Sequence, residues 1–294
     1  MPSIRPAHLD DATAVVGLRA LVYPYLVQGV EGTRQAIAAT PRNRRILVAE
    51  VDGAVVGWVS AYATGTAGEV SLLHVHPEQR GRGLGTALLT AALDHLGTLG
   101  VDRIRAWALE GSLDFARAHG FTPSRAVRYA ALDLRELPPM PPVPPGVELL
   151  PMDTLELSAL HAAHVAASAD EPGDVPVSPL SYDDWRASIW DNPDAARSAS
   201  TAAVVDGAPV ALAELLRDGH RVWSDMTATL PTHRGRGLAR LAKLAALHRA
   251  RAAGATAAYT SNDEANAPML AVNTRLCYRP VATQWSCLRA GGDR

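Results

Sequence analysis

The sequence predicts an α/β fold, a mixed α+β sheet covered by helices, that occurs twice along the chain. Two observations predict it. Strand-like apolar runs and Ala/Leu-rich helical runs follow one another in the same order in both halves. The segment at 80–85 also returns at 234–239, an offset of 234 − 80 = 154 residues. This offset is far longer than a solenoid repeat, so the sequence indicates a duplicated domain rather than a repeat array.

Proline marks the division between the two copies. Residues 138–146 are rich in proline, which lacks an amide donor and fixes φ, so they form an extended linker and not a helix or a central strand. We therefore expect an N-terminal domain at 1–137 and a C-terminal domain at 147–294, each long enough to bury its own core.

Each element of the first half follows from a local signal. The pair Asp52-Gly53 predicts a hairpin turn, Asp10 predicts the start of a helix, and Gly100 predicts the end of one. In order, the expected elements are a strand at 3–7, helices at 11–21 and 33–39, hairpin strands at 45–51 and 55–63, a strand at 69–76, a helix at 83–99, a strand at 103–109, a helix at 112–119 and a strand at 129–134.

The second half repeats this order with an insertion before its hairpin. Asp206-Gly207 predicts the turn, and Asn266 as a cap followed by Pro268 predicts the start of a late helix. In order, the expected elements are a strand at 147–152, a helix at 154–167, an aromatic helix at 182–190, hairpin strands around 206–207, a strand at 222–229, a helix at 237–253, a strand at 257–261, a helix at 267–276 and a strand at 281–288.

Composition excludes several classes of partner. The net charge of −2 gives no reason to expect a nucleic acid or an anionic membrane. The chain start lacks the apolar core of a signal peptide, and no run has the apolar length of a membrane span, so we expect a cytoplasmic monomer or homodimer. The two cysteines form no metal or disulfide pattern, and His74 and His76 lack a third ligand, so no metal is expected.

The repeated loop has the chemistry of an anion site. Each copy follows a strand-like run and opens a helix, which places free amide groups and the positive end of the helix dipole around one anion. A P-loop requires Gly-Lys-Ser/Thr, which is absent. A dinucleotide fingerprint requires G-x-G-x-x-G, whereas Gly81, Gly83 and Gly85 are spaced G-x-G-x-G and the second copy ends in Ala239.

Both copies resemble the Arg-x-x-Gly-x-Gly/Ala signature of the GCN5-related N-acetyltransferases. The resemblance covers nearly the whole chain and includes Gly120-Phe121 and Cys277-Tyr278 after the last short helix of each half. It implies two tandem domains of this family, acetyl-coenzyme A as co-substrate, and direct transfer of the acetyl group to a primary amine of a small molecule in a ternary complex. The implied cofactor-binding residues are Val75, Arg80, Gly81, Arg82, Gly83, Gly85 and Thr86 in the first half, and Thr229, Arg234, Gly235, Arg236, Gly237, Ala239, Arg240, Asn266 and Asn273 in the second.

The resemblance also suggests catalytic residues. In the first half Glu69 stands where the family often has its base, although an exposed carboxylate at a strand start is an equal interpretation. Ala116 stands where the family often has a tyrosine acid, so the proton donor is missing, and Tyr62 or Tyr129 stay open as substitutes.

In the second half Trp223 replaces the glutamate, and Asp225 is the nearest carboxylate on the same strand face. Asn273 takes the tyrosine position, where an amide can bind a ligand but cannot donate a proton of matched pKa. Two interpretations of Asn262 and Asn266 stay open. Either they line the ligand groove beside Asn273, or they serve only as turn and cap residues. The polar groove favours the C-terminal half as the active one.

An acidic and aromatic insertion follows in the second half, with Asp170, Glu171 and Asp174 before Trp185 and Trp190. It suits a cationic amine, or it is a solvated loop beside a helix that packs its tryptophans. Two rival functions remain: a regulatory protein that binds acetyl-coenzyme A without catalysis, and a transferase of another acyl group.

Overall fold

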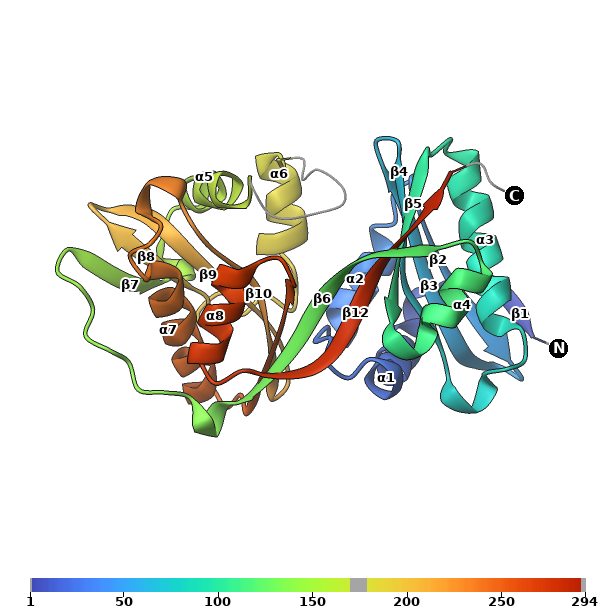
Figure 1. Ribbon diagram of the computed structural model, residues 1–294, viewed down its shortest axis with the longest axis horizontal. Coiled ribbons are helices and arrows are strands. Elements are labelled where there is room, and N and C mark those ends of the chain that lie inside the picture. The colour runs from blue at the N-terminus through green and yellow to red at the C-terminus, as the bar shows by residue number, and fades with distance from the viewer. Residues whose placement is uncertain (1, 170–178, 292–294) are drawn as a thin grey trace. The chain divides into compact units, whose positions relative to one another are not determined.

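The computed structural model describes residues 2–169 and 179–291, and its chain packs into two compact units (Figure 1). Unit 1 comprises Met1–Arg128 and Ala282–Arg294, and unit 2 comprises Tyr129–Val281. Both units have the predicted mixed α/β class, with strands and helices in the predicted order.

Unit 1 is a mixed sheet with hydrogen-bonded strand order β1-β2-β3-β4-β5-β12-β6. Strands β4 and β5 pair in parallel, whereas β1–β2, β2–β3, β3–β4 and β5–β12 pair antiparallel. Its elements are β1 (Ser3–Pro6), α1 (Ala12–Val22), α2 (Val30–Ala38), β2 (Arg44–Val51), β3 (Ala54–Thr64), β4 (Ala67–Val75), α3 (Leu84–Thr98), β5 (Arg103–Leu109), α4 (Leu113–Ala118), and parts of β6 (Thr122–Asp133) and β12 (Arg279–Ala290).

Apolar side chains cover both faces of this sheet. Strand β2 contributes to both faces, because its successive side chains point to opposite sides. Leu47 and Ala49 belong to the apolar cluster under α3, which supplies Leu84, Leu88 and Leu96. Ile46 and Val48 belong to the separate cluster under α1. Two helix layers therefore enclose the sheet (Figure 1).

Unit 2 repeats the plan with strand order β6-β11-β10-β9-β8-β7. Helix α7 packs on one face, and Trp185 and α5 belong to the cluster on the other. Its elements are part of β6, β7 (Val147–Pro151), α5 (Leu157–Ser168), α6 (Tyr182–Trp185) with a π-helical turn at Arg186–Trp190, β8 (Thr201–Val205), β9 (Ala208–Asp218), β10 (Arg221–Thr229), α7 (Leu238–Ala252), β11 (Ala257–Asp263), α8 (Ala267–Arg275) and the start of β12.

Local signals identified both hairpin turns, whereas the strand expected at 129–134 begins earlier, at Thr122 of β6. Asp52 and Gly53 both have positive φ, as do Asp206 and Gly207, which is the backbone that a type I′ hairpin turn requires. The prediction that Asp10 caps the first helix is wrong. A 3-10 turn at Leu9–Asp11 precedes α1, and the carboxylate that accepts a backbone amide there, from His8 at 2.7 Å, belongs to Asp11.

The last strand of each half does not pack within the domain range that the sequence predicts for it. Gln284–Ala290 of β12 pairs antiparallel with Leu109–Arg103 of β5, so the final strand of the sequence completes unit 1. Tyr129–Asp133 of β6 lies beside β11 in unit 2, where Leu132 is part of the core. Each unit is thus completed by a strand from the other half of the chain. The continuous ranges 1–137 and 147–294 stay a prediction about the duplicated sequence units.

Candidate functional site

The glycine loop of unit 1 joins β4 to α3. Gly81 and Gly83 have φ of 74° and 79°, a left-handed backbone that favours glycine. No side chain caps α3, and the amides of its first turn have no partner within the helix. A Cβ atom added at Gly81 or Gly83 would point into open space. The loop therefore leaves room for an anion at the positive end of the helix dipole.

The second copy has the same geometry. Gly235 and Gly237 have φ of 77° and 76°, and α7 begins at Leu238 without a side-chain cap. The predicted loop residues at the two helix starts are Gly85 and Thr86 in α3, and Ala239 and Arg240 in α7. The sequence repeat at the loop is therefore also a repeat of backbone conformation.

The first arginine of each loop donates a hydrogen bond to a backbone carbonyl at the end of the preceding strand. Arg80 donates through Nε to the carbonyl of Val75 at 3.3 Å, and Arg234 donates in the same way to Thr229 at 3.0 Å. Arg82 donates to the side chain of Gln79 at the surface. The charges expected around the anion are present, and Arg80 and Arg234 also fix the path of the loop.

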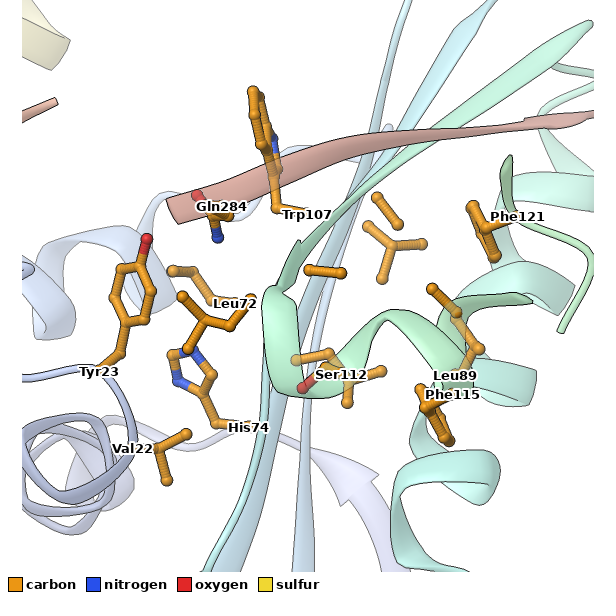
Figure 2. Close-up of a pocket in the computed structure, with 16 residues that line it drawn as sticks. Val22, Tyr23, Leu72, His74, Leu89, Trp107, Ser112, Phe115, Phe121 and Gln284 are labelled. Atoms are coloured by element: carbon orange, nitrogen blue, oxygen red, sulfur yellow. The ribbon is translucent and has the colours of Figure 1, made fainter. Parts of the chain in front are cut away.

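A pocket opens in unit 1 where β4 and β5 separate. Their parallel pairing ends at Val70↔Ala106. Beyond it β4 forms a bulge against β3 between Ser71 and His74, where Leu72 has a φ of 56°. The pocket has a volume of about 110 Å³. Figure 2 shows apolar and aromatic side chains around it.

His74 and Tyr23 line one side of this pocket (Figure 2). Their rings stack with centroids 5.7 Å apart and an interplanar angle of 30°. Burial, together with the nearby charges of Arg19 and Arg80, lowers the pKa of His74 to about 3. At neutral pH the pocket therefore presents an uncharged imidazole.

Glu69 does not line the pocket, but it contacts Trp107, which does. It is buried, forms an ion pair with Arg105 and accepts a hydrogen bond from Trp107 Nε1 at 3.3 Å. Trp107 itself lines the pocket. Tyr62, one of the two tyrosines considered as a substitute acid, contacts Glu69. Burial raises the pKa of the Tyr62 phenol well above the usual range, and the adjacent Glu69 carboxylate also raises it. The phenol is therefore protonated at neutral pH.

The corresponding region of unit 2 holds polar side chains. Three residues that line the pocket of unit 1 are apolar, whereas their counterparts are polar. Lys243 is the sixth residue of α7, as Leu89 is of α3. Asn273 corresponds to Ala116, and Tyr278 to Phe121, because each pair makes the same backbone hydrogen bond of 3.0 Å from the later residue to the earlier one.

These polar groups bind one another. Lys243 Nζ donates to Asn273 Oδ1 at 2.8 Å and lies 4.9 Å from the ring centroid of Tyr278. Asn273 Nδ2 donates to Asn262 Oδ1 at 2.6 Å. Lys243 is fully buried, and burial lowers its pKa to about 7. Asn273, predicted as a ligand-binding residue, thus has internal partners on both amide atoms.

The other predicted residues of unit 2 have different hydrogen-bond and ring partners. Asn266 caps α8 by accepting from the amide of Met269 at 3.3 Å, as its sequence position predicts. Asp225 accepts a hydrogen bond from Trp223 Nε1 at 3.1 Å. Tyr129 stacks near Trp223 with centroids 5.8 Å apart. Asp170, Glu171 and Asp174 lie outside the described residues.

Sequence reasoning missed three residues of these regions. Tyr23 follows α1, far in sequence from the loop, and Gln284 reaches the pocket only through the strand exchange. Lys243 could have been found, because it is the one lysine of the chain and stands at the offset of an apolar residue, Leu89.

Within 2–169 and 179–291, no group of three or more His, Cys, Asp or Glu side chains is arranged to hold a metal ion. No helix in that same part of the chain has the length and apolar character to span a membrane.

Known proteins resemble this chain in sequence and fold. The sequence profile of the Acetyltransferase (GNAT) family matches residues 18–121 and 162–276. A mycothiol acetyltransferase from Thermobispora bispora is 38% identical over 85 residues, which is 26% of this chain and 29% of that protein. The matched stretch therefore spans less than a third of this curated relative.

Two solved structures share the whole architecture. A tandem GNAT protein from the clavulanic acid biosynthesis pathway has a TM-score of 0.78 at 22% identity, with 100% of both chains covered. A GCN5-related N-acetyltransferase from Sphaerobacter thermophilus has a TM-score of 0.76 at 17% identity, covering 98% of this chain and 95% of that chain. At these identities the likeness shows the fold.

Proposed function

The chain belongs to the acetyltransferase (GNAT) family and is an acyltransferase, and on that premise we propose that unit 1 transfers the acetyl group of acetyl-coenzyme A to a primary amine of a small molecule. Family members use acetyl-coenzyme A as co-substrate. The observation that carries the assignment to unit 1 is the open, largely apolar pocket between β4 and β5, adjoining the strand that leads into the glycine loop.

The loop and pocket fit the two ends of this co-substrate. The open space beside Gly81 and Gly83, together with the uncapped start of α3, suits a diphosphate. The apolar lining, which includes Leu72 and Phe115, suits the pantetheine arm that leads to the thioester. The co-substrate supplies an activated acyl group; the chain must position it and manage protons.

The bulge in β4 offers the donor for the thioester oxygen. A bulge leaves one residue outside the regular ladder, and here it includes Leu72 and Leu73, which both line the pocket. We propose that a backbone amide of this bulge stabilises the negative charge that develops as the amine attacks. Fixed donors of this kind contribute strongly to acyl transfer.

Glu69 is the proposed base. As the new C–N bond forms and the C–S bond breaks, the amine loses a proton that a carboxylate can take through water. Glu69 reaches the pocket wall through its contact with Trp107. The leaving sulfur gains a proton, and Tyr23 is the phenol of the pocket lining that we propose for this step.

Unit 2 supports a different assignment. Lys243 and Asn273 stand where unit 1 has Leu89 and Ala116 of the pocket lining, and they bind one another and Asn262. We propose from this that unit 2 does not admit the pantetheine arm. This reverses the preference for the C-terminal half that the polar groove indicated in the sequence, because those polar groups satisfy one another.

Calorimetric titration of acetyl-coenzyme A tests this assignment, with Gly83→Glu and Gly237→Glu as a matched pair. Each substitution places a carboxylate in the open space of one loop. We expect one site per chain, lost in Gly83→Glu and kept in Gly237→Glu. Loss only in Gly237→Glu would move the site to unit 2.

Release of free thiol with a panel of primary amines then tests catalysis. Tight binding of acetyl-coenzyme A without thiol release by any amine would favour the regulatory alternative. Turnover with a longer acyl thioester in preference to the acetyl compound would favour the alternative acyl group. The cytoplasmic location and the monomeric or dimeric state stay predictions.

A further inference from the structure

Four polar or charged side chains form a row across the sheet of unit 1, which we call the polar row. In the strand registers Arg44 of β2 lies opposite Tyr62 of β3, and Tyr62 lies opposite Glu69 of β4. Glu69 in turn lies opposite Arg105 of β5. Residues paired across strands point to the same face of a sheet. It is the face that α1 covers further along β2, where Ile46 packs under that helix.

The charges of the polar row do not balance. Glu69 and Arg105 form an ion pair, so these two charges neutralise each other. Within residues 2–169 and 179–291, Arg44 forms no ion pair. Its guanidinium lies 5.0 Å from the ring centroid of Tyr62, which carries no charge at neutral pH. The row therefore has one positive charge without a counter-ion, which matches a ligand group with a single negative charge.

A ligand can reach the Arg44 guanidinium. Arg44 is the first residue of β2 and is half-buried, as is Tyr62. Its side chain lies over the ring of Tyr62, the neighbour of Glu69 in the row. A guanidinium group that stacks on a ring keeps its N–H groups at the edge of its plane. Two of these donors match the two oxygens of a carboxylate.

Unit 2 shows that the fold does not require these charges. The corresponding residues of unit 2, at the offset of 154, are Ser198, Leu216, Trp223 and Tyr259. Trp223 pairs with Leu216 on one side and with Tyr259 on the other, as Glu69 pairs with its two neighbours. None of these four residues is charged, although the strands pair in the same way. The charges in unit 1 are therefore not needed to build the sheet, which indicates a role in binding.

The spacing along the row restricts the form of the ligand. Neighbouring strands lie about 4.8 Å apart, so about 10 Å separates the backbones of Arg44 and Glu69. The Arg44 side chain lies over Tyr62, between the two strands, which shortens the gap between the charged groups. An amine that gives its proton to Glu69 while its own carboxylate binds Arg44 therefore has several carbon atoms between the two groups.

On the basis of the function proposed for unit 1, we propose that its acceptor is an amine with a carboxylate at the other end of a short carbon chain, and that Arg44 binds this carboxylate. The amine end lies at Glu69, where it loses its proton. The Tyr62 ring lies between the two and contacts the carbon chain. Arg44 takes part in no bond making or breaking and acts as a specificity residue.

Release of free thiol by the full-length protein at saturating acetyl-coenzyme A tests the proposal. The acceptors are ε-aminocaproate and its uncharged amide, ε-aminocaproamide, which have the same length. We expect kcat/KM of the wild type to be higher for the carboxylate by about 10-fold or more, since two charge-assisted hydrogen bonds are gained. Arg44→Gln should abolish this preference, chiefly through KM. Arg44→Lys, which keeps the charge but loses the paired donors, should reduce it by a smaller factor.

Arg45→Gln is the matched control. The side chain of Arg45 points to the opposite face of β2, the face on which Leu47 packs under α3, so the preference should not change. If Arg44→Gln fails to fold, the wild type and Arg44→Lys decide. Equal kcat/KM values for the two acceptors in the wild type, or the full preference in the folded Arg44 variants, would overturn the proposal.

Calorimetric titration with ε-aminocaproate separates this proposal from the proposed function. If no amine releases thiol but ε-aminocaproate binds, and Arg44→Gln abolishes that binding, the carboxylate site stands without the transferase role. If the amide reacts as well as the carboxylate, the transferase role stands and the carboxylate site is wrong. No turnover together with no binding of ε-aminocaproate would also overturn the site.

Discussion

Lys243 and Asn273 form a buried hydrogen bond of 2.8 Å between the Nζ and Oδ1 atoms, at positions where unit 1 has Leu89 and Ala116. This pair is one of the chemical differences between the two units. Unit 1 has a largely apolar pocket between its parallel strands, and unit 2 has a lysine and an amide at two positions that correspond to its lining.

The first prediction concerns this pair. Replacing only Lys243 by leucine leaves the buried Oδ1 of Asn273 without its donor, which costs about 1–3 kcal/mol. Adding Asn273→Ala removes the unsatisfied group, and the half-buried Asn262, which then loses its donor, can bind water instead, so the double variant should be more stable than Lys243→Leu alone. Chemical denaturation of the four proteins of this cycle measures the coupling. Strict additivity would show that the bond contributes nothing.

The second prediction concerns pH and His74. Its pKa of about 3 lies below the ordinary value of 6.5, so the unfolded chain binds the proton more readily. The stability from the uncharged imidazole is therefore full above pH 6.5 and falls as the pH decreases towards 3, by about 1.4 kcal/mol per pH unit. Melting temperatures of wild type and His74→Phe between pH 7.5 and 5 measure this. Equal slopes in both proteins would contradict the assignment.

The third prediction concerns Cys277, which has a φ of 68° at the position where unit 1 has Gly120 with a φ of 79°. A non-glycine residue with a left-handed backbone destabilises the folded protein by about 1–2 kcal/mol. Glycine removes this strain, but it also increases the conformational entropy of the unfolded chain, which offsets part of the gain. Cys277→Gly should therefore raise the melting temperature by about 2–4 °C. Cys277→Ala, which keeps a Cβ atom, is the control and should give no such rise.

The fourth prediction concerns Glu69. If it is the base of unit 1, Glu69→Gln should lower kcat by about 100-fold or more while the Kd for acetyl-coenzyme A changes little. The limb of the pH–rate profile that reports the base should also disappear. Glu50→Gln removes another carboxylate that pairs with an arginine, Arg5, and serves as the control. An unaltered kcat in Glu69→Gln would exclude the role.

Local chemistry explains what could be predicted from the sequence. Asp52-Gly53 adopts the expected turn, Asn266 caps α8, and β5 begins and ends as expected, because each depends on neighbouring residues alone. The glycine loop was recognisable for the same reason.

Long-range packing explains what could not be predicted. Lysine is among the residues least often buried, so the inward position of Lys243 contradicts its residue type, and only the repeat, which aligns it with Leu89, indicates it. Likewise, nothing in the residues around Gln284 indicates that β12 pairs with β5 of the other half of the chain.

The exchange of last strands has a consequence for synthesis on the ribosome. The sheet of unit 1 needs β12, which follows unit 2 in the chain, so the β5 edge of unit 1 is closed only after unit 2 has been made. The β5 edge must stay unpaired throughout translation of unit 2, and any premature stop before β12 leaves that edge open. A gene fragment that encodes only the first half therefore yields an incomplete sheet, whatever its catalytic residues.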